Sequence, residues 1–366
     1  MDIDKKINMA INICNNGRYK KVKFLSIYPF TTENISAYID MFDLKDRTLL
    51  TVGSSSDQVF NAILKGCHDI TLFDICPFTE EYYYLKTAAI KLMDRNEYLN
   101  FLCYKNYPRL FSKNSQAFLE SDFYSLLAYL EELKPEVSYF WCELLKRYKG
   151  RYIRKNLFNK DEYEVSVLKI MNRYLEDDMM YNLLRKRIDD INISFEYDNI
   201  FNIDDSKHYD NIFLSNIAAY HTLENFKYLY DICTKILNDE GKMLVSYLYD
   251  TDINTEYMSC EDEIYNLHAV FSTFKEVILT SFVGNNGLRY ADYSSRDSVL
   301  TYEKIKKSLE MGLIIILVTR TGFEPMNACV KGMCVQPLHQ RAIYKWWAWG
   351  DLNLRPHAYQ ACALTS

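Results

Sequence analysis

The feature that most constrains the fold is an alternation of short apolar runs with helical segments. Residues 49–52 form an apolar run that meets a glycine- and serine-rich turn, and a helical stretch follows over residues 58–65. A second apolar run over residues 70–73 ends at Asp74. The next segment carries one apolar stripe at helical spacing, made of Tyr82, Leu85, Ala89 and Leu92. Short apolar runs joined by helices predict βαβ units and a parallel sheet that is buried on both faces.

The same pattern continues along the chain. Further strands are expected over residues 193–197, 211–215, 242–247, 276–282 and 298–302. We therefore predict an α/β protein with a mostly parallel sheet, helices on both faces and a helical insertion. The expected parts are an N-terminal helical segment (1–48), the first half of the core (49–95), a helical insertion or cap (96–190), the second half of the core (191–307) and a tail (308–366).

Composition narrows the class of protein. With 43 Lys and Arg against 49 Asp and Glu, the formal net charge of −6 argues against a dedicated nucleic-acid binder. The longest aliphatic run, Leu313 to Val318, is too short to span a bilayer, and residues 1–6 lack the order of a secretory signal. Ten scattered cysteines suit a reducing compartment. These features predict a cytoplasmic protein without a transmembrane segment.

The tail differs from the rest of the chain. Residues 319–366 hold five basic and two acidic residues and three of the four tryptophans, Trp346, Trp347 and Trp349. The string from Trp349 to Thr365 resembles spurious read-through translation of a tRNA gene region, which would leave the tail disordered and outside the fold. A zinc site is the alternative, with ligands drawn from Cys329, Cys334, His339, His357 and Cys362. Their four-residue spacings are looser than those of a close cysteine pair, so we predict no metal site.

Polar residues follow the first two predicted strands. Gly53, Ser54, Ser55, Ser56 and Asp57 come after the first, and Asp74 lies 21 residues beyond Gly53, at the end of the second. Such a turn lets backbone amides approach a ligand, and a carboxylate on the neighbouring strand accepts ribose hydroxyls. A single glycine instead of G-x-G-x-x-G favours a nucleoside without a pyrophosphate and disfavours an NAD-dependent dehydrogenase. The alternative is an ordinary turn with a helix-capping serine.

Two more strand ends carry polar residues. Asp198 and Asn199 follow the third predicted strand, and Ser215 and Asn216 end the fourth. Because ligands bind beyond the carboxyl ends of parallel strands, four polar ends indicate a ligand crevice. Tyr220 and His221 come next and are the candidate catalytic bases. The basic run over residues 146–155, interleaved with tyrosines, would suit a lipid headgroup or phosphate-rich surface, although a solvated helix end is the favoured interpretation.

The strings Leu49 to Gly66 and Thr71 to Pro77 resemble the first half of a Rossmann-type S-adenosylmethionine (SAM) transferase. More narrowly, they resemble the family around the betaine-lipid 3-amino-3-carboxypropyl transferases, as do Leu85 to Lys91, Tyr139 to Trp141 and Tyr209 to Ile217. The match runs over about residues 20–305. Members of that family often carry glycine just before the aspartate of the loop, where this chain has Ser56.

The resemblance implies a role for each strand end. Gly53 to Asp57 would border the methionine part of SAM, Asp74 with Ile75 beside it would hold the ribose, Asp198 and Asn199 would lie at the adenine, and Ser215 and Asn216 at the sulfonium. It implies a SAM-dependent transferase that moves a methyl or 3-amino-3-carboxypropyl group to a small-molecule or lipid acceptor. A non-catalytic nucleoside-binding or protein-interaction module is the alternative. Neither the acceptor, the group transferred nor the oligomeric state follows from the sequence.

Overall fold

The computed structural model describes residues 1–16, 25–103, 116–159, 165–215, 217, 229, 232–233, 235–246, 274–282 and 297–304. Its strands are β1 (Thr48–Val52), β2 (Asp69–Phe73), β3 (Asn192–Glu196), β4 (Tyr209–Phe213), β5 (Leu237–Val245), β6 (Phe274–Phe282) and β7 (Asp297–Lys304). They form one seven-stranded sheet in the order β3-β2-β1-β4-β5-β7-β6. The tail, with its read-through and zinc alternatives, lies outside the described residues.

The sheet is mostly parallel, as the sequence predicted, and it contains one reversed strand, β7. All pairs from β3 to β5 are parallel, whereas β7 runs antiparallel to both β5 and β6. A reversed strand that pairs with both neighbours needs no helical crossover between β6 and β7. The predicted fold class, an α/β Rossmann-like fold with a mostly parallel sheet, is therefore confirmed.

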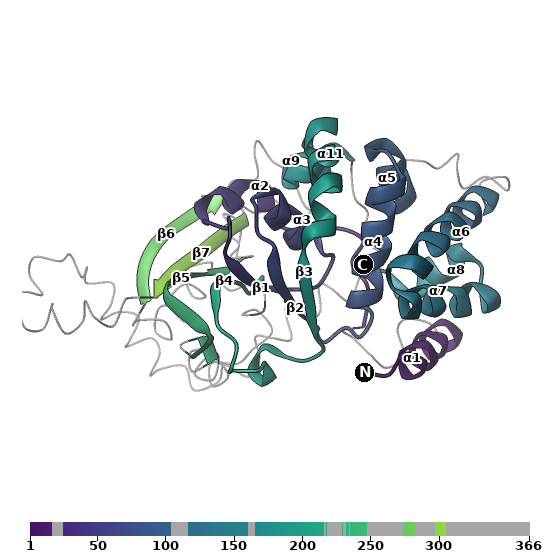
Figure 1. Ribbon diagram of the computed structural model, residues 1–366, viewed down its shortest axis with the longest axis horizontal. Coiled ribbons are helices and arrows are strands. Elements are labelled where there is room, and N and C mark those ends of the chain that lie inside the picture. The colour runs from purple at the N-terminus through teal and green to yellow at the C-terminus, as the bar shows by residue number, and fades with distance from the viewer. Residues whose placement is uncertain are drawn as a thin grey trace, which may run out of the picture.

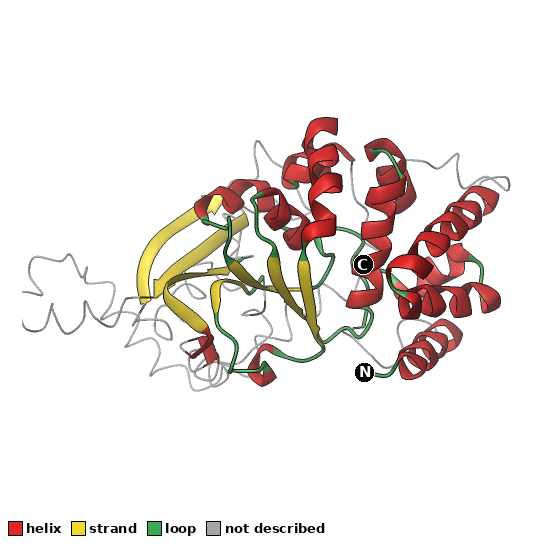
Figure 2. Ribbon diagram, in the orientation of Figure 1, coloured by secondary structure: helices red, strands yellow, loops and turns green. Residues whose placement is uncertain are grey.

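Helices and the loops between them make up the rest of the described chain, and most of the helices lie to one side of the sheet (Figures 1 and 2). The N-terminal part has α1 (Ile3–Asn16), α2 (Ile35–Tyr38) and the short η1 (Ile39–Met41); α3 (Asp57–Leu64) and α4 (Thr79–Leu92) follow β1 and β2. Between β2 and β3 the chain continues through α5 (Arg95–Leu102), α6 (Gln116–Leu133), α7 (Pro135–Arg147), α8 (Gly150–Leu157), α9 (Val165–Met171), α10 (Arg173–Glu176), α11 (Asp178–Arg187) and η2 (Ile188–Asp190). The short η3 (Ile200–Asn202) precedes β4.

Local sequence explains where several of these helices begin. Pro135 occupies the first turn of α7, where a missing N–H costs nothing. Asp94 caps α5 in a reciprocal capping box with Glu97. Glu80 and Glu81 lie in the first turn of α4 and Lys91 in its last, which matches the helix dipole.

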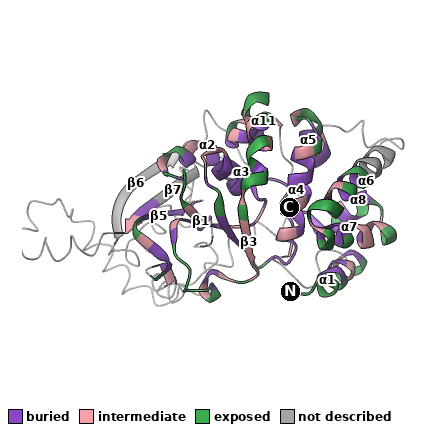
Figure 3. Ribbon diagram, viewed as in Figure 1, coloured by how far each residue is buried: buried purple, intermediate pink, exposed green. Residues whose placement is uncertain are grey.

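The sheet buries both faces against separate apolar clusters. On β1 the neighbouring residues Leu49 and Leu50 belong to different clusters, as successive side chains of a strand must. Helices α3 and α4 cover the face of Leu49, and helical residues including Leu229 and Cys233 cover the other. Burial is greatest along the central strands and α4, whereas α1 and α7 expose their outer sides (Figure 3).

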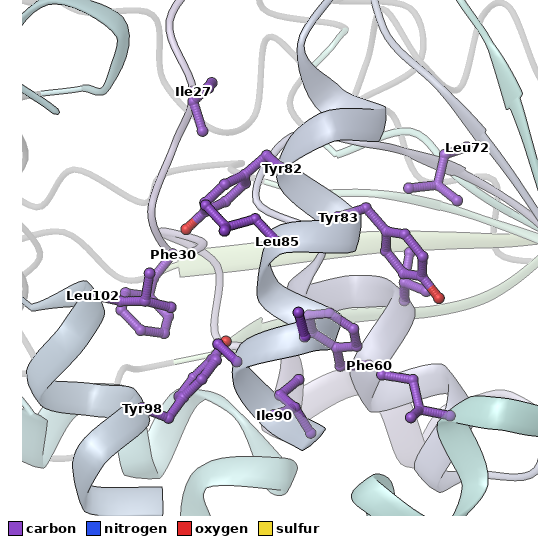
Figure 4. Packing of buried hydrophobic residues seen from close by; sticks show 14 of the residues in the cluster. Ile27, Phe30, Phe60, Leu72, Tyr82, Tyr83, Leu85, Ile90, Tyr98 and Leu102 are labelled. Carbon is purple, nitrogen blue, oxygen red and sulfur yellow. The ribbon is translucent and has the colours of Figure 1, made fainter. Parts of the chain in front are cut away.

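Helix α4 lies at the centre of the larger cluster. Its side chains Tyr82, Tyr83, Leu85 and Ile90 point to several elements at once (Figure 4). Phe60 of α3 stacks on Tyr83, with ring centroids 5.7 Å apart. Other labelled contacts come from the N-terminal segment, β2 and α5: Ile27, Phe30, Leu72, Tyr98 and Leu102.

A buried ion pair fixes α4 to the loop after β1. Lys86 Nζ lies 2.5 Å from Asp57 Oδ1, and both side chains are fully buried. Lys86 also donates to the carbonyl oxygens of Ser55 (2.9 Å) and Pro29 (3.2 Å). Burial lowers the pKa of Lys86, and the Asp57 carboxylate opposes that shift.

Both carboxylate oxygens of Asp57 also accept hydrogen bonds from neutral groups. Its Oδ1 accepts from the Tyr174 hydroxyl of α10 (2.6 Å), and its Oδ2 accepts from the Thr31 amide (2.5 Å) and the Ser55 hydroxyl (3.1 Å). One carboxylate thus joins the N-terminal segment, the β1 loop, α4 and α10.

We predict that Lys86→Met lowers the free energy of unfolding by about 3–5 kcal/mol, because it leaves a buried carboxylate without its cation. Urea denaturation measures this loss. Lys65→Met is the matched control, since Lys65 pairs with Asp40 at 2.8 Å on the surface, where such a pair is worth less than about 1 kcal/mol. Equal losses in the two variants would contradict the role given to Lys86.

Candidate functional site

The strand order places a topological switch point at the carboxyl end of β1. From β1 the chain proceeds to β2 and β3 on one side, and to β4 and β5 on the other. Connections on the two sides therefore diverge between β1 and β4, which is the topological switch point where open α/β sheets bind ligands. The loop over residues 53–56 follows β1, and Ser215 follows β4, so both flank this point.

Backbone strain gathers at these strand ends. Ser54, Ser56 and Ser215 have φ values of +35°, +65° and +53°, in the left-handed region that L-residues rarely adopt. Such residues cluster at ligand sites because the surrounding structure holds them there. Ser56 thus takes a left-handed conformation of the kind that glycine adopts readily, at the position where members of the resembled family often carry glycine.

At residue 53 a glycine is needed because there is no space for a side chain, and not because of a left-handed backbone. A Cβ atom at Gly53 would lie 2.2 Å from the Thr79 methyl carbon and 3.3 Å from Asp74 Oδ2. Thr79 begins α4, so the glycine lets the first helix after β2 approach the β1 loop closely.

Asp74 organises the ends of β1 and β2. Its Oδ2 accepts from the Ser54 amide (2.7 Å) and the Thr79 hydroxyl (3.0 Å), and its Oδ1 accepts from the Cys76 amide (2.9 Å). Burial raises the pKa of Asp74, and these donors oppose the shift. The next residue, Ile75, is 50% exposed, unusual for a large aliphatic side chain beside a buried strand.

The third strand end lies next to the second. The Asp74 amide donates to the carbonyl oxygen of Glu196 (3.1 Å), the last residue of β3. Asp198 follows and is exposed; its Oδ1 accepts from the Asn199 amide (2.7 Å) and from Asn202 Nδ2 (2.8 Å). Asn199 caps η3 through the Phe201 amide (3.4 Å). The ends of β1, β2 and β3 thus form one continuous edge.

Two of the expected site residues have side chains that are buried within the fold. Asp57 is fully buried beneath the loop, and its oxygens are taken by Lys86, Tyr174, Thr31 and Ser55. The Ser55 side chain is buried with it. Both were expected to border a ligand; the structure makes their side chains part of the support of the loop. The sequence could not show this because the partners lie up to 117 residues away.

At the fourth strand end only part of the expected set is described. Ser215 is buried, and its hydroxyl donates to Glu33 Oε1. Asn216, Tyr220 and His221 lie outside the described residues, so the candidate bases are not placed.

Sequence reasoning missed Glu33. Its side chain is 3% exposed, and its Oε2 accepts from the Tyr38 hydroxyl and Gln58 Nε2, each at 2.8 Å. Burial raises the pKa of Glu33, and its hydrogen-bond donors oppose the shift. Glu33 precedes a helix of only four residues, and an acid before a helix is ordinarily solvated, so the sequence carries no signal of this placement.

A second buried charge cluster supports β3. Lys6 Nζ of α1 lies 2.7 Å from Glu81 and 3.2 Å from Glu80, and it donates to the Tyr197 hydroxyl (2.8 Å). Burial raises the pKa of Glu81 to about 6. The cluster anchors α1 to α4 and to the residue that follows β3.

The basic run over residues 146–155 is partly committed to the fold. Lys146 and Arg147 pair with Glu143 at 2.7 and 2.5 Å, and Arg154 donates to the Phe101 carbonyl (3.0 Å) at the end of α5. Its exposed basic residues are Lys146, Arg147, Lys149, Arg151 and Lys155.

Within the described part of the chain, no three His, Cys, Asp or Glu side chains converge as a metal site would require. None of the helices in these ranges is long and apolar enough to cross a bilayer.

No family model matches the chain. No curated protein matches it either. Solved structures with a similar arrangement are SAM-dependent methyltransferases. The glycopeptide N-methyltransferase MtfA, complexed with SAM, is 10% identical, with 79% of this chain and 98% of that chain covered and a TM-score of 0.37.

Two further similar structures come from named bacteria. The 1,6-didemethyltoxoflavin-N1-methyltransferase of Burkholderia thailandensis is 9% identical, covers 75% of this chain and 76% of that one, and has a TM-score of 0.35. A TehB-like SAM-dependent methyltransferase of Corynebacterium glutamicum is 9% identical, covers 82% and 97%, and has a TM-score of 0.34. Likenesses at this level carry no argument about activity, so the fold assignment rests on the strand order itself.

We predict that Gly53→Ala destabilises the protein by about 1–3 kcal/mol, because the new methyl group overlaps the Thr79 methyl. Thr79→Ser removes that methyl and keeps the hydroxyl that donates to Asp74. Thermal unfolding of the two single variants and the double variant measures the coupling. The double variant should recover most of the loss, whereas strictly additive losses would refute this packing account.

Proposed function

We propose that the protein is a SAM-dependent transferase. The observation that supports this most is the pairing of a left-handed, glycine-containing turn after β1 with an acid at the neighbouring end of β2, joined by the Ser54–Asp74 hydrogen bond of 2.7 Å. This pair lies beside the topological switch point, where a nucleoside ligand would meet the close turn and the carboxylate together.

The chain's residues fit SAM at this edge. The backbone of the loop over residues 53–56 would border the methionine part, and Asp74 the ribose. Exposed Ile75 offers an apolar face to the adenine, with Asp198 and Asn199 beside it. Ser215, and with it Asn216, would lie at the sulfonium.

The hydrogen bonds of Asp74 refine its expected role. A carboxylate has about four acceptor directions, and three of those of Asp74 are filled by Ser54, Cys76 and Thr79. We therefore expect Asp74 to accept one ribose hydroxyl instead of two, with the loop held in place by the same side chain.

When bound, SAM supplies an electrophilic carbon next to a sulfonium, with a thioether as leaving group. The chain's part is to position the acceptor and to take up its proton. Tyr220 and His221 remain our candidates for the base. The methyl and the 3-amino-3-carboxypropyl group are both compatible with this edge, since the choice depends on how the sulfonium is turned.

The acceptor is proposed as a small molecule or a lipid. The resemblance to the betaine-lipid transferase family favours a lipid, and the exposed residues Lys149, Arg151 and Lys155 offer a surface for peripheral membrane contact. We propose a cytoplasmic location, and a division of the chain at the boundaries given above. A non-catalytic nucleoside-binding module is the alternative, and it would bind SAM without turnover.

Calorimetry on the full chain tests the proposal. We expect SAM and S-adenosylhomocysteine to bind and NAD not to bind. Asp74→Asn should weaken SAM binding by about 2 kcal/mol, because a charge-assisted hydrogen bond becomes a neutral one. Asp69→Asn is the control, since exposed Asp69 begins the same strand at its opposite end, and it should bind SAM normally. NAD binding in preference to SAM, or no SAM binding at all, would contradict the proposal.

A further inference from the structure

We propose that Glu33 is the counter-charge for a cationic group of the ligand at the topological switch point. This inference rests on the proposed function and adds a binding residue that lies outside the strand-end motifs.

The position of Glu33 bridges the two sides of the switch point. Its Oε2 accepts from Gln58 in α3, which follows β1, and its Oε1 accepts from Ser215, which follows β4. Tyr38 of α2 donates to the same Oε2 at 2.8 Å. The carboxylate is thus held by side chains from both divergent halves of the sheet, where a ligand at this edge would lie.

Comparison with the other buried acids shows what Glu33 lacks. Among the described residues, three acids have almost no exposed surface, Glu33, Asp57 and Glu81, whereas Asp74 is partly exposed. Asp57 has Lys86 at 2.5 Å, and Glu81 has Lys6 at 2.7 Å. Within the same described ranges, no Lys, Arg or His lies within ion-pair distance of Glu33, whose donors are all neutral.

This difference has an energetic consequence. A buried carboxylate without a cation is costly when ionised, and hydrogen bonds from neutral groups offset only part of the cost. Burial accordingly raises the pKa of Glu33 in the free protein. A cation delivered to this position would restore the pairing that Asp57 and Glu81 obtain from lysines.

The ligand offers two groups with this chemistry. SAM carries a sulfonium and an α-ammonium, S-adenosylhomocysteine carries only the ammonium, and 5′-methylthioadenosine carries neither. These three compounds share the adenosine part, so they separate the contribution of each charge from the binding of the nucleoside.

Calorimetry of wild type and Glu33→Gln with the three compounds tests the inference. The amide keeps the shape of the side chain and removes its charge. We expect SAM affinity to fall at least tenfold and 5′-methylthioadenosine affinity to stay within twofold. If the affinity for S-adenosylhomocysteine falls in parallel, the group paired with Glu33 is the ammonium. If only the affinity for SAM falls, the paired group is the sulfonium. Unchanged SAM affinity, or an equal loss for all three compounds, would overturn the inference.

Two controls keep this result separate from folding and from the proposed function. Glu143→Gln removes a glutamate charge on α7 and should bind like wild type. If Glu33→Gln does not fold, Glu33→Asp carries the test, because it keeps the charge but withdraws it, and it should weaken SAM severalfold and 5′-methylthioadenosine not at all. If Glu33→Asp bound SAM as tightly as wild type does, the inference would be refuted. Failure of wild type to bind SAM would refute the proposed function instead.

Discussion

The ion pair between Asp57 and Lys86 is the interaction on which the rest of the architecture depends. It lies under the loop after β1 with no exposure of either side chain. Through Asp57 the N-terminal segment, the β1 loop and α10 meet, and through Lys86 the central helix α4 joins them. Removing either charge would leave the other buried without its counter-charge, so the four elements are held as one unit.

That support allows the neighbouring loops to be strained. Ser54, Ser56 and Ser215 stay in the left-handed region although none is glycine. Each such residue costs about 1–3 kcal/mol, and the cost is sustained only where packing over-determines the backbone. The strained residues, Asp74 and Glu33 all lie at the carboxyl ends of β1, β2 and β4. The destabilising features are thus concentrated at the edge of the sheet where a bound ligand would offset their cost.

The fold was predictable from sequence because its signals are local. Apolar runs that end at Gly53 and Asp74 mark parallel strands without knowledge of their partners, and each of the seven expected strands is present within a few residues. The reversed direction of β7 was not predictable, since strand direction depends on a connection and not on the run itself.

The site was only partly predictable. The place of Asp74 at a strand end could be predicted, but the surroundings of Asp57 and Glu33 depend on partners distant in sequence. Asp57 meets Lys86 29 residues later, and Glu33 meets Ser215 182 residues later. No periodicity or motif encodes such pairs, so a carboxylate that supports the loop and one that faces the switch point look alike in the sequence.

Hydrogen–deuterium exchange with and without saturating SAM tests most directly whether the ligand lies at the switch point. The account predicts slower amide exchange in three segments that are separate in sequence, residues 31–35, 53–58 and 74–76, with no change over residues 66–70 at the opposite end of β2. Protection confined to segments away from these strand ends, with SAM bound, would contradict it.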